Sequence, residues 1–318
     1  MLGPLPIVAA SFALSHWARR GGEDLALEGN HVLAAAEADN LAEGAVDAGR
    51  PAESADRDLT AACELAAADL AEQLGEECAV VVHPPFVLGG DLSREELEAW
   101  HQRTVQPSAR AMAAAYFQTP PDRPIAVLLF NDEAGYRHWA AALFGDEDVS
   151  VYGYYKPGRR TLVMNIATGG GTLVHELTHA LVDFDFPTVP DWFNEGLASL
   201  HEQCRFRPDG EGIDGLVNWR LPALQEAIRQ GRLRSLQRLI GDDDFRGAEV
   251  GLNYAQARYF CLFLQERSLL EDFSRRLRAN GSDDPLGLAT VGEIFPELSW
   301  ERLDADFQAW ALQLEAAP

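Results

Sequence analysis

The sequence predicts an α+β fold, in which a small mixed sheet precedes a mainly helical second half. Between residues 59 and 166, short runs of β-branched and other apolar residues alternate with segments of helical periodicity. After Thr172, most apolar residues recur at helical spacing. The chain has 318 residues, of which 47% are hydrophobic and 24% charged, so it can bury a large core in the manner of a globular protein.

The first half contains all the predicted strands. A helix is expected over Leu59 to Leu74, followed by a strand over Cys78 to Leu88 that Pro84-Pro85 interrupts. Ser93-Arg94-Glu95-Glu96 is a capping box that opens a long helix, which we expect to break near Pro107. The other elements expected here are a buried strand at Ile125 to Phe130, a helix at Asp132 to Phe144, and strands at Val151 to Tyr155 and Thr161 to Ile166.

The second half is expected to be a set of helices. After the helix that begins near Thr172, further helices are expected near Asp191 to Ala198 and at Leu221 to Arg229, Tyr254 to Glu266, Leu270 to Ala279 and Trp300 to Glu315. We therefore divide the chain into an acidic, Ala- and Gly-rich lead-in over residues 1–58, expected to be flexible or peripheral, and one domain over residues 59–318. Residues 59–183 would form its α/β upper part and residues 184–318 its helical lower lobe.

Charge and the N-terminal residues limit the partners and the location. A net charge of −24 argues against nucleic acids and anionic membranes, because both would be repelled. Met1 to Leu14 is apolar but too short to span a bilayer, and no Lys or Arg precedes it as in a signal peptide. We expect a soluble protein without a membrane span. It would be cytoplasmic by default, or extracytoplasmic if the start codon is wrongly assigned. The oligomeric state is left open.

The most informative motif is His175-Glu176-Leu177-Thr178-His179, an H-E-x-x-H sequence. Residues four apart lie on one face of a helix, so His175 and His179 can reach the same tetrahedral zinc ion. Glu176 would then project toward a water molecule at the metal. Chance occurrence is the alternative, and the helix-compatible apolar residues around the motif argue against it.

Glu195 is the candidate for a third metal ligand. A catalytic zinc usually has three protein ligands and leaves its fourth position to water or substrate. Glu195 lies about one turn into the second predicted helix, for which Asp191 is the expected N-cap. The alternative is a solvated glutamate in a first helical turn, stabilised by the helix dipole. The histidine pair upstream makes ligation the better interpretation, with one zinc ion per chain.

The two segments together carry a resemblance to a known family. His175-Glu176-Leu177-Thr178-His179 followed by Trp192-Phe193-Asn194-Glu195-Gly196-Leu197-Ala198 resembles the gluzincins, the thermolysin-like MA peptidases, and is similar to bacterial peptidase-MA-like domains. The resemblance implies a zincin-like fold, with the small sheet over the H-E-x-x-H helix. It also implies that both histidines and Glu195 bind zinc and that Glu176 is the catalytic base. The gap between His179 and Glu195 is shorter than in thermolysin and no G-A-M-E-N-like motif is present, so neither thermolysin's substrate cleft nor exopeptidase action is transferred.

These residues predict metal-assisted hydrolysis of a peptide or protein substrate. Zinc would polarise the scissile carbonyl, and Glu176 would pass a proton from water to the leaving amine. Tyr254 is the candidate hydrogen-bond donor to the oxyanion, because Tyr254-Ala255-Gln256 resembles a Y-A-Q segment of peptidase-MA-like proteins. A core tyrosine with its hydroxyl at the surface is the alternative. Two further functions stay open: a zinc hydrolase of another amide or ester, and a catalytically silent binding or scaffold module of the same fold.

Other residues near the motif carry weaker predictions. The strand at Arg160 to Ile166 is expected to be a sheet edge that binds substrate backbone. His201 and Glu202 are expected at the surface, with support of the metal ligands as the alternative. Tyr152, Tyr154 and Tyr155 either line a cleft or pack a hairpin. No function is assigned to the other histidines, and the four cysteines, which lack C-x-x-C spacing, are expected to be free thiols: Cys63, Cys78, Cys204 and Cys261.

Overall fold

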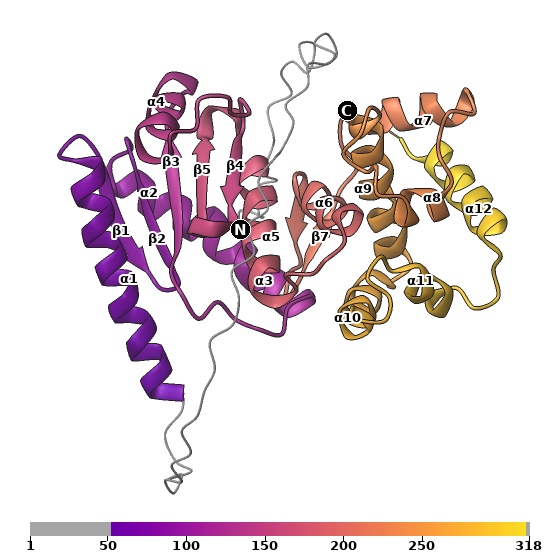
Figure 1. Ribbon diagram of the computed structural model, residues 1–318, viewed down its shortest axis with the longest axis horizontal. Helices are drawn as coiled ribbons and strands as arrows, with labels where there is room; N and C mark the ends of the chain where they lie inside the picture. Colours follow the sequence, from indigo (N-terminus) through magenta and orange to yellow (C-terminus); the bar gives the residue numbers. More distant parts are fainter. Residues whose placement is uncertain (1–51, 316–318) are drawn as a thin grey trace, which may run out of the picture.

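The computed structural model describes residues 52–315 (Figure 1). The N-terminal part of this region is built around a five-stranded mixed sheet. The strand order is β1-β2-β3-β5-β4. Strands β2, β3 and β5 are parallel, whereas β1 pairs antiparallel with β2 and β4 antiparallel with β5. The strands are β1 (Ala79–His83), β2 (Phe86–Gly90), β3 (Ile125–Phe130), β4 (Gly153–Lys156) and β5 (Thr161–Asn165). The predicted α+β class with a small mixed sheet is confirmed.

Two predictions about the strands were wrong. The segment from Cys78 to Leu88 is a hairpin rather than one interrupted strand, because the chain reverses at Pro84-Pro85, whose peptide bond is cis, and pairs His83 with Phe86. Strand β5 is not an edge: it pairs with β3 on one side and β4 on the other, and all its residues are buried. The edge at this end of the sheet is β4.

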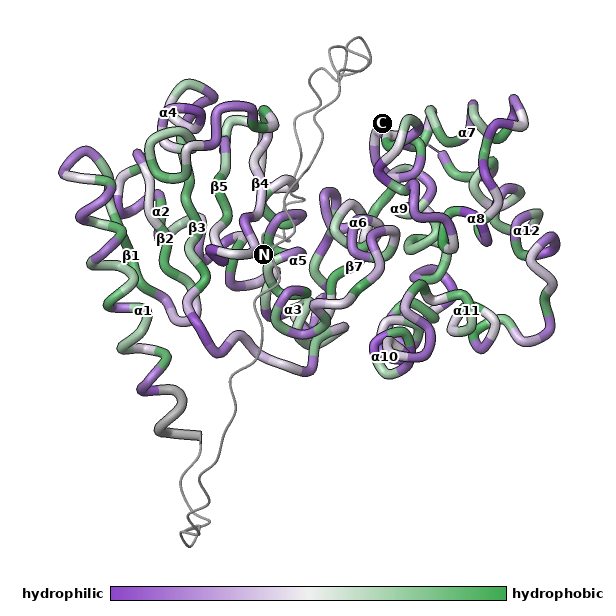
Figure 2. The backbone as a smooth tube through the Cα atoms, in the orientation of Figure 1, coloured by the Kyte–Doolittle hydropathy of each residue, from purple (hydrophilic) through white to green (hydrophobic). Residues whose placement is uncertain are grey.

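Each face of the sheet is covered by its own set of helices. Alternate residues of β3 point to opposite faces, so Leu128 and Phe130 pack with α1 (Ala52–Leu74) and α4 (Glu133–Phe144). Val127 and Leu129 belong to the larger core that contains α5 (Gly170–Asp185). The central strands are accordingly hydrophobic along their length (Figure 2). Helix α1 begins inside the segment expected to be a lead-in, whose residues 1–51 lie outside the described part.

The predicted long helix after the capping box is irregular rather than broken. Ser93 and Glu96 form the capping box of α2 (Arg94–Trp100) as expected. A π-helical segment (His101–Val105) then leads directly into α3 (Gln106–Ala115), with Pro107 in the first turn of α3. Pro107 has no N–H to continue the helical ladder, and the bonding pattern changes just before it, where the N–H of Gln106 bonds to the carbonyl of His101. Helices α2 and α3 lie against the same core as α5.

The second half is helical apart from one short hairpin. Helix α6 (Asp191–His201) packs on α9 (Val250–Glu266), whose residues from Ala255 to Leu264 are all buried. The hairpin of β6 (Cys204–Phe206) and β7 (Ile213–Gly215) was not predicted, nor were α8 (Leu236–Gly241) and α11 (Leu288–Ile294). The remaining helices are α7 (Leu221–Arg229), α10 (Leu270–Asn280) and α12 (Trp300–Gln313). Within residues 52–315, no helix has the length and apolarity that a membrane crossing requires.

Candidate metal centre

Helices α5 and α6 lie between the sheet and the C-terminal helices and carry the predicted metal ligands and Glu176 (Figure 1). Helix α5 starts in the glycine-rich segment after Gly169, and its N-terminus lies close to the end of α6. A Cβ atom on Gly171 would be only 2.2 Å from the backbone oxygen of Glu202, so this approach requires glycine. One turn further along α5, His175 and His179 face the same side, with their Nε2 atoms 3.1 Å apart.

Glu195 comes to the two histidines from α6. Its Oε2 atom lies 3.5 Å from Nε2 of His175 and 3.5 Å from Nε2 of His179. Helix α6 begins at Asp191, but Pro190 occupies the N-cap position and makes no side-chain cap, so the N-cap predicted for Asp191 was wrong. The Asp191 carboxylate contacts Arg246 instead.

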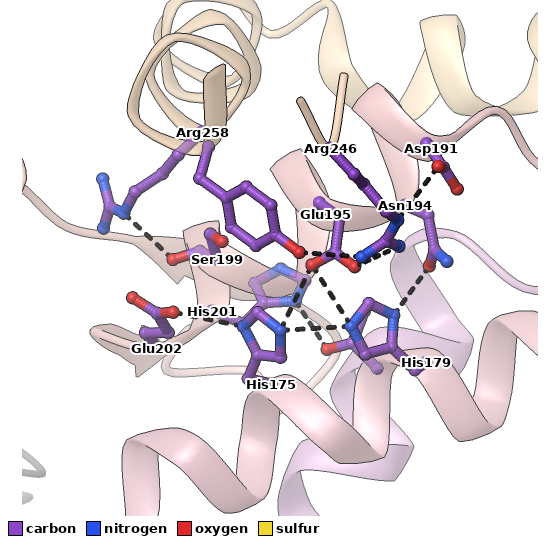
Figure 3. Close-up of polar contacts among 12 residues, drawn as sticks. His175, His179, Asp191, Asn194, Glu195, Ser199, His201, Glu202, Arg246 and Arg258 are labelled. Atoms are coloured by element: carbon purple, nitrogen blue, oxygen red, sulfur yellow. Dashed lines mark hydrogen bonds and ion pairs between the residues drawn. The ribbon is translucent and has the colours of Figure 1, made fainter. Parts of the chain in front are cut away.

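The outer nitrogen of each imidazole faces an oxygen atom (Figure 3). Nδ1 of His179 lies 2.8 Å from Oδ1 of Asn194, and Nδ1 of His175 makes an ion-pair contact of 3.2 Å with Oε1 of Glu202. Because these oxygens only accept, both rings favour a proton on Nδ1 and a lone pair on Nε2. Such partners hold metal-binding histidines in the ligating tautomer.

Three electron-pair donors therefore converge, and their chemistry fits a metal ion. The ligand atoms of His175, His179 and Glu195 all lie within 4.8 Å of one another. Oε2 of Glu195 is buried and has no hydrogen-bond partner, although a buried carboxylate oxygen normally has one. Two imidazole nitrogens and one carboxylate oxygen are a donor set that zinc and related divalent ions accept. No other group of three or more potential ligands occurs within residues 52–315.

The electrostatics of the site favour positive charge. Burial lowers the pKa of His175, but the carboxylates of Glu195 and Glu202 outweigh it and raise this pKa to about 10. Burial raises the pKa of Glu195, yet the two imidazoles beside it hold it well below its usual range. The pocket thus stabilises positive charge between these side chains, and a metal ion could take the place of a proton there.

His201 is buried and Glu202 is partly buried, so the prediction that both lie at the surface was wrong. Glu202 is held by Arg220, with Nη2 and Oε1 2.8 Å apart; burial raises its pKa, but Arg220 and His175 lower it to about 2. His201 is 0% exposed and its Nδ1 lies 3.4 Å from Oγ1 of Thr178. Burial lowers the pKa of His201 to about 3, with a smaller contribution from Arg258.

A cavity of about 340 Å³ opens over the three donors. Glu176 lines it, half-buried, beside both histidines. The edge strand β4 contributes Tyr154 and Tyr155 to the wall, and the hydroxyl of Tyr155 donates to Asp183 at 3.0 Å. Tyr152 does not line this cavity. Tyr154 and Tyr155 therefore line the cleft and also pair β4 with β5.

Tyr254 and Arg246 complete the cavity wall from the C-terminal half. Tyr254 lies near the start of α9, and its hydroxyl accepts a hydrogen bond of 3.0 Å from Nη1 of Arg246. The tyrosine thus lies beside the three candidate metal ligands. Its catalytic role stays a prediction. Arg246 was not predicted. It sits in a loop far along the chain from both motifs, and no local spacing singles it out among the other arginines.

The remaining histidines and cysteines lie away from the centre. His83 and His101 stack with ring centroids 3.9 Å apart, whereas His138 is exposed against Trp139. His16 and His31 fall outside the described residues. All four cysteines are free thiols, as predicted.

In comparisons with known proteins, no family model and no curated protein sequence matches this chain.

Proposed function

We propose that the protein is a zinc-dependent metallopeptidase of the gluzincin type, with His175, His179 and Glu195 as zinc ligands. The observation that carries the proposal is the convergence of these three donors in a cavity that Glu176 also lines. Three protein ligands of the N, N, O type leave a fourth zinc position for water or substrate, as in catalytic rather than structural zinc sites.

The fold supports this proposal. Strand β5 leads through a short 3-10 turn (Ile166–Thr168) into α5, so that the sheet lies over the helix that carries H-E-x-x-H. Helix α6 then returns against α5, and the C-terminal helices pack on the side of α6 away from the sheet (Figure 1). This is the arrangement that a zincin-like fold requires. The cleft between the sheet and the helical lobe holds the substrate.

Zinc supplies a Lewis acid that polarises a carbonyl and lowers the pKa of water near it. Glu176 takes a proton from the attacking water and transfers it to the leaving amine. Tyr254 lines the cavity beside the three donors, where its hydroxyl can donate to the oxygen of the scissile carbonyl. His175 and His179 are held at their outer nitrogens, so the ligand face needs little rearrangement.

The edge strand β4 is the expected docking site for the substrate backbone. It pairs with β5 on one side only, and Tyr154 and Tyr155 place it along the cavity wall. An extended peptide can add to such an edge through main-chain hydrogen bonds. The role that the sequence suggested for the strand at Arg160 to Ile166 passes to β4.

The proposal is tested with Glu176→Gln, which removes the base but keeps the size of the side chain. We expect zinc content to be unchanged and cleavage of a peptide library to fall by at least roughly 100-fold, the contribution typical of a positioned general base. The exposed Glu226 provides the matched control, and Glu226→Gln should keep wild-type cleavage.

Other outcomes would assign another function. Zinc binding without peptide cleavage by the wild type, but with cleavage of small amides or esters that Glu176→Gln abolishes, would indicate a different hydrolase. Zinc binding with no hydrolysis of any of these would indicate a binding module.

A further inference from the structure

Arg246 joins three residues around the metal centre through one guanidinium group (Figure 3). Its Nη2 donates to Oε1 of Glu195 at 2.8 Å, and its Nε donates to Oδ2 of Asp191 at 3.0 Å. Its Nη1 donates to the hydroxyl of Tyr254 at 3.0 Å. The planar guanidinium fixes the directions of these bonds, which a lysine could not reproduce together.

The two carboxylate oxygens of Glu195 face different groups. Oε1 is bound to Arg246, while Oε2 faces the imidazoles at 3.5 Å. Rotation of the carboxylate would break the charge-assisted bond to Arg246. The arginine therefore presents a single oxygen of Glu195 to the metal position.

The loop that carries Arg246 is held in place by the two residues before it. Asp244 makes two bonds with Arg234, at 2.7 and 3.0 Å. Phe245 is buried, and its carbonyl accepts a bond of 2.8 Å from Asn253 at the start of α9. The backbone on the N-terminal side of Arg246 is thus attached to α9, and the guanidinium reaches from there to α6.

We propose that Arg246 is a positioning residue that holds Glu195 in its ligating orientation and so raises the affinity of the centre for zinc. The inference rests on the metal site of the proposed function. It makes zinc binding depend on the loop between α8 and α9, and therefore on the C-terminal half of the domain. Partners of metal ligands commonly contribute this way, and their loss typically costs roughly 10- to 100-fold in metal affinity.

The exposure of the side chains indicates which of the three Arg246 contacts contributes most. The Arg246 and Asp191 side chains are about half exposed, so their ion pair is screened by water and weak. The side chain of Glu195 is only 6% exposed, and Arg246 is the only arginine or lysine that contacts it within the described residues. Removing Arg246 leaves that carboxylate without its orienting donor.

The test measures zinc dissociation constants by competition with a chromophoric chelator, which requires no catalytic activity. Arg246→Met should weaken binding by roughly 10- to 100-fold. Arg238→Met is the matched control, because Arg238 is exposed on α8 and its guanidinium pairs with Asp242 just beyond that helix, and it should bind zinc like the wild type. The visible spectrum of the Co²⁺-substituted protein should change in Arg246→Met and not in the control.

Combining the change with Glu195→Gln tests whether Arg246 acts through Glu195. In the Glu195→Gln background, Arg246→Met should weaken zinc binding by no more than about twofold, since the oriented ligand is already lost. Equal weakening in both backgrounds would overturn the proposal, as would wild-type affinity in Arg246→Met.

If Arg246→Met does not fold, Arg246→Lys replaces it. The zinc affinity of Arg246→Lys is expected to lie between those of wild type and Glu195→Gln. Wild-type affinity in Arg246→Lys would contradict the proposal.

The outcome is independent of the peptidase assignment. A wild type that binds zinc but cleaves no peptide, with zinc affinity still lowered in Arg246→Met, contradicts the proposed function alone. Unchanged affinity in Arg246→Met together with peptide cleavage by the wild type contradicts this inference alone.

Discussion

Glu202 lies against the outer side of His175, with its Oε1 atom 3.2 Å from Nδ1, while Glu195 approaches the inner nitrogen of the same ring. Both glutamates come from one helix segment: residues seven apart lie on the same helical face. Helix α6 and the residue that follows it therefore supply one of the three donors and a second carboxylate beside the neighbouring histidine. Arg220 in turn binds Glu202, so this carboxylate stays charged although it is only 17% exposed.

The first prediction concerns this carboxylate. Glu202→Ala removes the acceptor that favours the proton on Nδ1 of His175, so zinc affinity should fall by roughly 10- to 100-fold. Glu226→Ala is the control, because Glu226 is exposed and its carboxylate contacts only the nearby Arg229 and Gln230 within the described residues. Chelator competition on both variants measures the effect, and equal affinities would show that Glu202 does not support the ligand.

The second prediction concerns the ligand set. Purified wild type should contain about one zinc ion per chain, and His179→Ala and Glu195→Ala should each lose it. His138→Ala should retain the metal, because His138 is exposed away from the centre. Elemental analysis of the four proteins decides the matter. Zinc retained in Glu195→Ala would contradict a three-ligand site.

The third prediction concerns the close approach of α5 and α6. A methyl group on Gly171 would meet the Glu202 backbone oxygen at 2.2 Å, so Gly171→Ala must separate the two helices. We expect the free energy of unfolding to fall by about 1–3 kcal/mol, the usual cost of overpacking. Gly292→Ala in α11 meets no atom within 4 Å and should gain up to about 1 kcal/mol from helix propensity. Urea denaturation of both variants provides the comparison; equal stability would show that the helices adjust freely.

The parts of the site that local sequence could predict are those set by helix geometry. His175 and His179 follow from a spacing of four residues, and the strand Ile125–Phe130 from a continuous apolar run. The spacing of seven residues between Glu195 and Glu202 places both on one helical face. A polar residue at a helix end is usually exposed, however, so the sequence favoured a surface position for Glu202. Arg246 carries no comparable signal, because only tertiary packing brings its loop to α6.

The fourth prediction concerns Arg258, which is 0% exposed in α9. Its Nε donates to the Ser199 carbonyl at 2.9 Å, and its Nη2 donates to the Leu216 carbonyl. Arg258→Met leaves both buried carbonyls without these donors, at about 1–3 kcal/mol each. The free energy of unfolding should therefore fall by about 2–6 kcal/mol, whereas Arg238→Met should change it by less than about 0.5 kcal/mol. A loss below about 1 kcal/mol in Arg258→Met would mean that other donors satisfy these carbonyls.

The fifth prediction concerns pH and the buried His201. Burial lowers its pKa to about 3 in the folded protein, whereas an unfolded histidine titrates near its usual value of about 6.5. Below that value only the unfolded chain takes up this proton, so the stabilisation is fully present above about pH 6.5 and is lost as the pH falls toward 3. Between pH 7 and pH 5 this residue alone should cost about 2 kcal/mol.

The comparison with His201→Asn isolates that contribution, because the other titrating groups are common to both proteins. The variant should be less stable than wild type at pH 7, since it loses packing against Tyr116. Its free energy of unfolding should nevertheless fall less steeply toward pH 5, by about 2 kcal/mol over the interval. Urea denaturation at both pH values, with chelator present so that metal binding does not contribute, measures the two slopes. Parallel slopes would show that His201 titrates alike in the folded and unfolded states.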